Sequence, residues 1–468
     1  MNLKNYDAKK EFKYFIKEFV FPLLGMKDNY LQSVSENENV QSLIYYFDGK
    51  IYFYPFKKSK FGLCTDTVPN YDNFDFRLCK KVISNLVKVA YNNLNGGTKK
   101  QFRYINFQQC VASYKAAVQS AICTYLTGKE NFRGDDFSCN STLLSLFEKL
   151  ECWSVKTYEG KKVPFGFVIN LIDKAKEKIN YLEFLDEEFS ATLTDGLSSI
   201  IELDEDGNYL DYKSVFMDNS IKECELTNCL PIRFTQIIKE NLKAHSKKIG
   251  VFLLSGGDIF VAKDEKIELI KRNDKWANFS YISFINAMRK YKNLNDISDE
   301  LLKEIFSTAV DVSLSHCGGI IAVVEDGKYL KTSNEQFILS DCDNLLVDLS
   351  PNQLEKELTK SGEKEHNIKK RIMKRQIIQK LIGDNKYFGN INRKLRNELV
   401  GLDGATIIQK DGQIVAFGAI IQSEKGSSGG GRGAAAKTLS KYKGLSIKIS
   451  TDGYIEVYSD YELKYFIK

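Results

Sequence analysis

Histidine is scarce in this chain, and long apolar runs are missing from it. Only 3 of the 468 residues are histidine, and His316, at the entrance of a strand-like segment, is interpreted as a structural residue rather than a general base. No apolar run of about 18 residues occurs, which argues against a membrane-spanning helix. The apolar stretch 12–24 is interrupted by lysine, glutamate and proline, so it does not resemble a signal peptide. We therefore expect a cytoplasmic protein that does not enter a membrane.

Cysteine pairs of the kind that bind zinc are also missing. The chain has 10 cysteines and no Cys-x-x-Cys pair. The closest two, Cys224 and Cys229, have four residues between them, and no His/Cys cluster completes a zinc site. Buried, reduced thiols are the expected state. A P-loop, a dinucleotide-binding glycine pattern and a Ser-His-Asp set are absent as well.

The charge balance is only mildly basic. The chain carries 67 lysine and arginine residues against 61 aspartate and glutamate residues, a net charge of +6. A nucleic-acid-binding protein usually concentrates its basic residues on one face. The basic cluster at residues 369–375 alternates with apolar residues, as on the solvated face of an amphipathic helix. Nucleic acid is therefore not the expected partner, whereas a small anionic ligand is compatible with this charge.

The order of helix-like and strand-like segments indicates an α+β (mixed α/β) fold. Hydrophobic residues make up 43% of the chain, and its length favours two or three domains. We expect residues 1–155 to form a mixed, helix-rich domain of unknown role and residues 156–290 a β-rich middle domain. Residues 291–468 are expected to form a mixed β-sheet flanked by helices.

Local signals predict the main elements. Apolar residues at helical spacing predict helices at 77–94, 107–126 and 299–314, and Ser298 is the expected N-cap of the last one. Asp48-Gly49 is typical of a hairpin turn between two strands. In the C-terminal domain the predicted strands are 320–324, 405–409, 414–422, 445–450 and 454–458.

Asp403, Gly404 and Ala405 stand at the start of one of these strands. Two small residues after an aspartate let a ligand approach the backbone closely, and the carboxylate is suited to a metal ion or a ribose hydroxyl. An Asp-Gly pair is also a common turn. This motif alone therefore does not assign a site.

A glycine-rich segment with one arginine follows the next strand. It contains Gly429, Gly430, Gly431, Arg432 and Gly433, and the alanines after it favour a helix over residues 434–442. Glycines are costly to order, so a flexible linker is one interpretation. However, a glycine loop that enters a helix presents backbone N–H groups to an anion, and arginine adds forked donors suited to phosphate. We therefore predict a phosphate-binding loop.

Together the two motifs resemble the DAC domain of diadenylate cyclases. The resemblance rests on the order of a helix, Ser-His-Cys-Gly-Gly, Leu-Asp-Gly-Ala-Thr-Ile-Ile, a hairpin and a Gly/Arg loop, and it covers about residues 295–468. Enzymes of this family join two ATP molecules into cyclic di-AMP at an active site assembled from two facing domains. The resemblance therefore implies a nucleotide ligand, a homo-oligomer through this domain and, in an active member, a Mg²⁺ or Mn²⁺ ion near Asp403.

The glycine-rich segment departs from the family pattern. The family's Arg-His-Arg-Ala-Ala motif aligns with Arg432 and the four residues after it, so the first arginine is present, but glycine and alanine replace the histidine and the second arginine. The family's Ser-Glu-Glu turn reads Ser-Thr-Asp here, which leaves Asp452 as the second candidate metal ligand. Phosphoryl transfer depends on positioning and on neutralising phosphate charge. These losses should therefore reduce turnover more than binding.

Three functional hypotheses follow. The first is a DAC-like sensor that binds ATP or a cyclic dinucleotide in second-messenger signalling. The second is an active diadenylate cyclase, or a diverged nucleotide second-messenger synthase, that uses Asp403, Asp452 and Arg432 with a divalent metal ion. The third is a structural or partner-binding protein that has lost its ligand. No effector domain is recognisable, so the output is expected from the N-terminal segments or from a separate effector protein.

Overall fold

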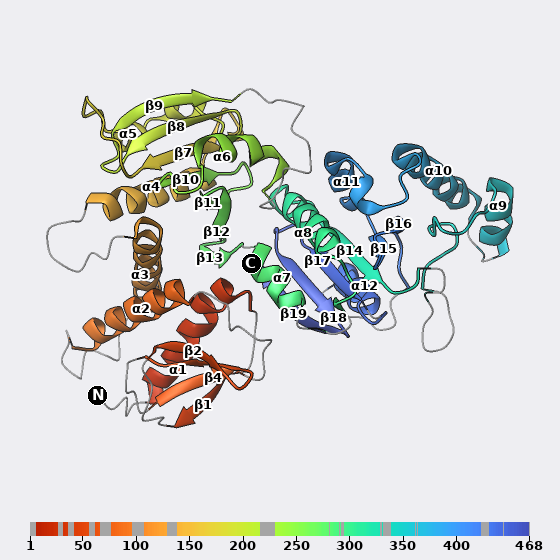
Figure 1. The fold of residues 1–468 in the computed structure, drawn as a ribbon, viewed down its shortest axis with the longest axis horizontal. Helices are drawn as coiled ribbons and strands as arrows, with labels where there is room; N and C mark the ends of the chain where they lie inside the picture. Colours follow the sequence, from red (N-terminus) through yellow and green to blue (C-terminus); the bar gives the residue numbers. More distant parts are fainter. Residues whose placement is uncertain are drawn as a thin grey trace. The chain divides into compact units, whose positions relative to one another are not determined.

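A computed structural model describes most of the chain. The described residues are 6–26, 31–35, 42–55, 61–65, 76–95, 107–128, 138–215, 230–279, 281–289, 291, 294–327, 330, 338–360, 362, 364–422, 430–442 and 444–467. Over these residues the chain has the mixed α/β fold that the sequence predicts (Figure 1). None of the helices there combines the length and the apolar composition that crossing a bilayer requires.

The chain divides into two compact units. Unit 1 comprises Met1–Ser220, Arg233–Ser283 and Lys468, and unit 2 comprises Ile221–Ile232 and Phe284–Ile467. Unit 1 thus spans predicted domain 1–155 and most of predicted domain 156–290, and one buried apolar cluster in it includes residues from Phe12 to Trp276. The boundary predicted near residue 290 falls close to the start of the main segment of unit 2.

Unit 1 combines helices with two larger sheets and a short hairpin. Its α-helices are α1 (Tyr6–Phe15), α2 (Arg77–Asn95), α3 (Phe107–Thr127), α4 (Ser138–Val155), α5 (Tyr181–Phe184) and α6 (Thr235–Asn241). Its strands are β1 (Leu31–Ser35), β2 (Ile44–Phe47), β3 (Lys50–Phe53), β4 (Phe61–Thr65), β5 (Thr157–Tyr158), β6 (Lys161–Lys162), β7 (Phe165–Asn170), β8 (Ser199–Asp204), β9 (Tyr209–Ser214), β10 (Lys248–Leu253), β11 (Ile259–Lys263), β12 (Lys266–Arg272) and β13 (Lys275–Asn278).

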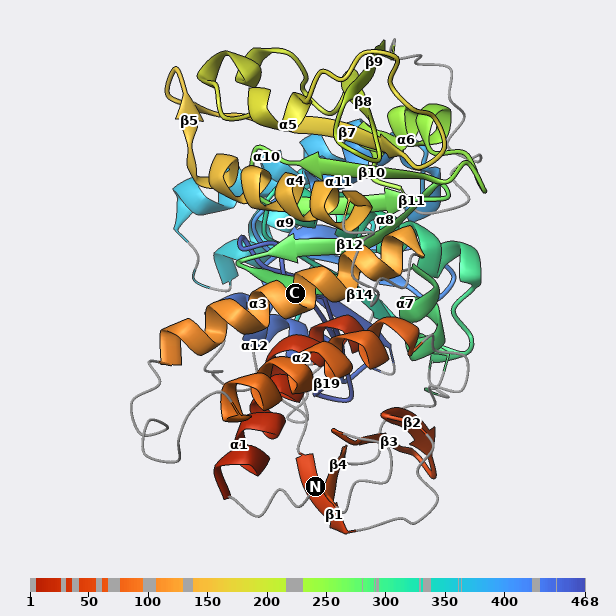
Figure 2. The same ribbon diagram turned by 90° about the vertical axis from the view of Figure 1, so that its left-hand side faces the viewer.

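A seven-stranded sheet contributes residues of six of its strands, β7, β8 and β10 to β13, to the buried cluster of unit 1. Its strand order is β13-β12-β11-β10-β7-β8-β9, and only β7 and β8 are parallel neighbours. Helix α4 runs along this sheet (Figure 2). Its Phe147 contacts Trp276 of β13, with ring centroids 4.9 Å apart. A smaller sheet has the order β1-β4-β3-β2. The predicted turn between β2 and β3 is confirmed, since Asp48 and Gly49 have φ values of 48° and 71°, the left-handed conformation that a tight hairpin needs.

Unit 2 is built around a six-stranded mixed sheet. Its α-helices are α7 (Tyr281–Met288), most of which belongs to this unit, α8 (Asp299–Leu314), α9 (Pro351–Lys360), α10 (Glu365–Ile382), α11 (Arg393–Val400) and α12 (Gly430–Leu439). Its strands are β14 (Gly319–Val324), β15 (Ala405–Gln409), β16 (Ile414–Ala419), β17 (Leu445–Ile449), β18 (Ile455–Ser459) and β19 (Glu462–Ile467). The order is β16-β15-β14-β17-β18-β19, with β14 and β15 parallel and the other neighbours antiparallel.

Helices cover both faces of this sheet. On one face, Ile320 and Ala322 of β14 share a buried cluster with Ala436 and Leu439 of α12. Residues of a strand alternate between faces, so Gly319 belongs to the other face, and the carbonyl of Val400 at the end of α11 approaches it there. Helix α8 packs beside α11, and the predicted N-cap of α8 is confirmed because Ser298 accepts a hydrogen bond from Leu301 N.

Candidate functional site

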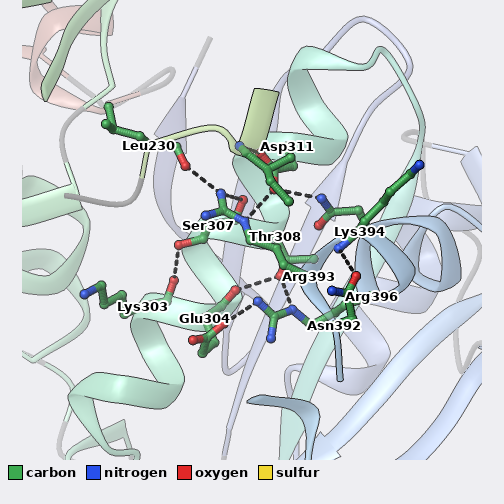
Figure 3. Close-up of polar contacts among 12 residues, drawn as sticks. Leu230, Lys303, Glu304, Ser307, Thr308, Asp311, Asn392, Arg393, Lys394 and Arg396 are labelled. Atoms are coloured by element: carbon green, nitrogen blue, oxygen red, sulfur yellow. Dashed lines mark hydrogen bonds and ion pairs between the residues drawn. The ribbon is translucent and has the colours of Figure 1, made fainter. Parts of the chain in front are cut away.

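The segment that leads into Asp403 is fixed by a buried polar network between α8 and α11. Arg393 Nε donates to Asp311 Oδ2 over 2.7 Å, and Arg396 Nε donates to Thr308 Oγ1 over 2.9 Å (Figure 3). Both arginine side chains are almost fully buried. Buried arginines require such partners, so the network sets the position of α11. Helix α11 ends at Val400, immediately before the Asp403 turn.

The turn itself depends on two glycines that meet across the sheet. Gly404 has a φ of 112°, and a Cβ there would lie 2.4 Å from the carbonyl carbon of Gly418. Gly418, near the end of β16, also has a positive φ, of 59°. Its carbonyl accepts a hydrogen bond from Lys374 Nζ of α10. The small residues at this turn therefore allow two backbone segments to meet, and the close approach of a ligand stays a prediction.

The helix in the glycine-rich segment starts earlier in the sequence than the composition predicts. Helix α12 starts at Gly430, so the described part of the predicted loop forms the first turn of that helix, while Gly429 lies outside the described residues. Glycine disfavours helix, but Ala434, Ala435 and Ala436 are buried against the sheet. We attribute the early start to this packing, which outweighs the local propensity.

One cavity brings the two sequence motifs together. It has a volume of about 630 Å³ and is lined by Asp403, Gly404 and Ala405 from one motif and by Gly430, Gly431 and Arg432 from the other. Apolar side chains complete the walls: Ile320, Ala405, Ala419, Ile420, Ile421 and Ala435. Ligand pockets of this size usually combine apolar walls with a few polar groups. The cavity has that composition.

Arg432 and Asp403 face each other loosely at this cavity. The Arg432 guanidinium lies 3.9 Å from Asp403 Oδ1, beyond hydrogen-bonding distance, and the Asp403 side chain is 90% exposed. Gly318 makes room for the arginine, since a Cβ there would lie only 2.0 Å from Arg432 Nη1. A weak, solvated ion pair contributes little to stability. Arg432 is therefore available to an incoming anion.

Sequence reasoning missed three polar residues of the cavity, Lys448, Ser450 and Thr451. They enter the site because β17 pairs antiparallel with β14, which places Lys448 opposite Ile320. The only local signal is the alternation of polar and apolar residues along β17, with Ser446 and Lys448 on the face toward α12. That pattern identifies a face of a strand but not its neighbour in the sheet.

Two other predicted residues are not part of the cavity wall. Gly433 is buried inside α12, and Asp452 lies in the turn between β17 and β18, next to Thr451, which does line the cavity. No three His, Cys, Asp or Glu side chains come together as a metal site in the described parts of the chain. Among the described residues, Asp403 is the only carboxylate that lines the cavity, and we derive no step through a metal ion.

The basic cluster of α10 is only partly a solvated face. Lys369 and Lys370 are exposed, but Arg375 is 4% exposed. Arg375 Nη1 donates to the carbonyl of Asn344 over 2.7 Å, and its Nη2 donates to the carbonyl of Val347. Arg375 therefore fixes the chain before α9 and is not on the surface that the sequence pattern predicts.

Comparison with known proteins does not assign the chain to a family. No protein-family model matches the chain, and a search of curated proteins finds no significant match.

Proposed function

We propose that residues 291–468 bind a nucleotide, either ATP or a cyclic dinucleotide, and act as a DAC-like sensor in the cytoplasm. The observation that carries this proposal is that one cavity is lined by both the Asp403 turn and the first turn of α12. The apolar walls suit a base, and Arg432 with the helix start suits a phosphate.

The proposal favours binding over turnover. The charged residues that line the cavity are Arg432, the exposed Asp403 and Lys448, and Lys448 is paired with Glu456. A phosphoryl-transfer site normally needs more positive charge around the phosphates. Recognition needs only net attraction and a fitting shape, and both are available at this cavity.

The first experiment is a thermal-shift and calorimetric titration of the full chain with ATP, cyclic di-AMP and adenosine. A ligand at 100 times its Kd should raise the free energy of unfolding by about 2.7 kcal/mol. Arg432→Ala should weaken binding of ATP or cyclic di-AMP by about tenfold or more, since a charged hydrogen bond is lost.

Arg289→Ala is the matched control. Arg289 is an arginine of the same unit that pairs with Asp299 and does not line the cavity. It should leave binding unchanged. If no nucleotide stabilises the protein, the proposal is wrong and a partner-binding role is favoured instead.

A second assay separates sensing from synthesis. The protein is incubated with ATP and Mg²⁺ or Mn²⁺, and the products are separated by chromatography. We expect no cyclic di-AMP. Formation of cyclic di-AMP that Asp403→Ala abolishes would replace the sensor by an active cyclase.

A further inference from the structure

The cavity contains a second positive charge, on Lys448 of β17. Lys448 and Arg432 are the two basic residues among those that line the cavity, and they come from different elements. The Lys448 side chain is 18% exposed. A partly buried ammonium interacts with an anion more strongly than one in bulk water, because the surrounding dielectric is lower.

Lys448 is held in place by Glu456 of the neighbouring strand. Its Nζ lies 2.9 Å from Glu456 Oε2, and Tyr458 Oη donates to the same oxygen over 2.8 Å. Burial and the hydrogen bond to Glu456 raise the pKa of Tyr458, so the phenol stays protonated and keeps donating. Glu456 therefore holds Lys448 and Tyr458 together on this face of the sheet.

We infer that Lys448 is a second anion-binding residue of this cavity and that it contacts a phosphate group of the nucleotide. This inference rests on the proposed function and deepens it. The loop around Arg432 supplies only one guanidinium, and a second cation adds to the attraction for a ligand with two or more negative charges. ATP and cyclic di-AMP share that phosphate chemistry, whereas adenosine lacks it.

Lys448→Met tests the role because it keeps most of the aliphatic chain and removes the charge. Binding of ATP, of cyclic di-AMP and of adenosine is measured by calorimetry. We expect the affinity for whichever phosphate-bearing ligand binds to fall by about tenfold or more, while any affinity for adenosine changes by less than about twofold. Lys448→Arg should restore part of the lost affinity.

Lys464→Met is the matched control in the same sheet. Lys464 of β19, like Lys448, pairs with a glutamate. Its partner is Glu462 of the same strand, and its Nζ lies 4.9 Å from the ring centroid of Tyr291. Its side chain is 14% exposed, close to the value for Lys448, and it does not line the cavity. This variant should bind all three ligands as the original chain does.

Glu456→Gln tests whether Lys448 contacts the ligand or only forms a structural ion pair with Glu456. If Lys448 contacts phosphate, removing the charge of Glu456 makes the cavity more positive, and phosphate affinity should stay equal or rise. If the pair is only structural, Glu456→Gln and Lys448→Met should weaken binding to the same extent. That second result overturns the inference.

The remaining outcomes also decide between the two proposals. Binding that depends on Arg432 but is unchanged in Lys448→Met overturns the inference about Lys448 and leaves the nucleotide site standing. An equal loss of affinity for adenosine and ATP in Lys448→Met also overturns it. Adenosine has no phosphate, so the loss of a phosphate contact cannot weaken its binding. No binding of any of the three ligands overturns both.

Discussion

Charged side chains are paired differently in the seven-stranded sheet and at the Asp403 end of the six-stranded sheet. In the seven-stranded sheet they form close ion pairs. Glu202 accepts from Lys248, and Arg272 donates to Asp258 through both Nε and Nη2. At the end of the six-stranded sheet, the carboxylate of Asp403 is 90% exposed and 3.9 Å from its nearest cation.

The cavities differ in the same way. The small cavity beside Lys271 and Trp276 in unit 1 has a volume of about 10 Å³, whereas the cavity in unit 2 has about 630 Å³. Closely paired, buried charges maintain a fold, because each partner alone would be costly in the interior. Loosely paired charges beside a large cavity are instead compatible with ligand binding. The difference indicates which charges can be removed without unfolding the protein.

The largest effect is expected from Asp311→Ala in unit 2. Its carboxylate accepts from Arg393 Nε, and its loss leaves a buried guanidinium without its anion. We expect the free energy of unfolding to fall by about 3–5 kcal/mol, measured by urea denaturation. Asp403→Ala is the matched control and should change stability by less than about 0.5 kcal/mol. Equal losses in the two variants would remove the distinction between structural and ligand-binding charges.

The next largest effect is expected from Gly404→Ala. The substituted residue would have to adopt a φ of 112° with its Cβ 2.4 Å from the Gly418 carbonyl carbon. Backbone has little freedom to move away, so a loss of about 2 kcal/mol in unfolding free energy is expected. Denaturation by urea measures it, and a stability equal to that of the original chain would contradict the close approach of the two strands.

Gly318→Ala should affect ligand binding rather than stability, the reverse of Gly404→Ala. Here the added Cβ meets the end of the flexible Arg432 side chain rather than backbone. We expect nearly unchanged thermal stability and, under the proposed function, nucleotide binding weakened by about tenfold, because the guanidinium must move. A large drop in melting temperature with unchanged binding would show that Gly318 serves the fold and not the site.

The last prediction concerns the pH dependence that Glu202 of unit 1 gives to stability. Burial acts to raise the pKa of this carboxyl, but hydrogen bonds from Lys213, Lys248 and Asn170 outweigh burial and hold the pKa below its ordinary value of 4.5. A lowered folded-state pKa contributes stability that is complete above 4.5 and is lost as the pH falls through the folded-state value. The stability advantage over Glu202→Gln should therefore shrink below pH 4.5. A constant difference in unfolding free energy across that range would contradict this origin.

Local signals in the sequence predict much of the secondary structure but little of the site. The helix Asp299–Leu314 and its cap at Ser298 follow from apolar spacing and a capping residue, and the structure confirms both. The start of α12 at Gly430 was not predicted, because the packing of its alanines on the sheet outweighs glycine propensity. Lys448 could not be assigned to the cavity, because no residue near it indicates that β17 pairs with β14.

The central position of β14 has a consequence for how the chain is made. Its neighbours β15 and β17 both come later in the sequence, and Leu445 follows Val324 by 121 positions. At about 5–20 residues per second, a ribosome needs roughly 6–24 s to cover that interval. During this time at least one edge of the apolar strand β14 has no neighbouring strand to pair with, and unpaired strand edges promote aggregation. Expression temperature and chaperone supply should therefore influence the yield of folded protein. The cavity is completed only after β17 has joined the sheet, so no ligand of that cavity can assist folding at this stage.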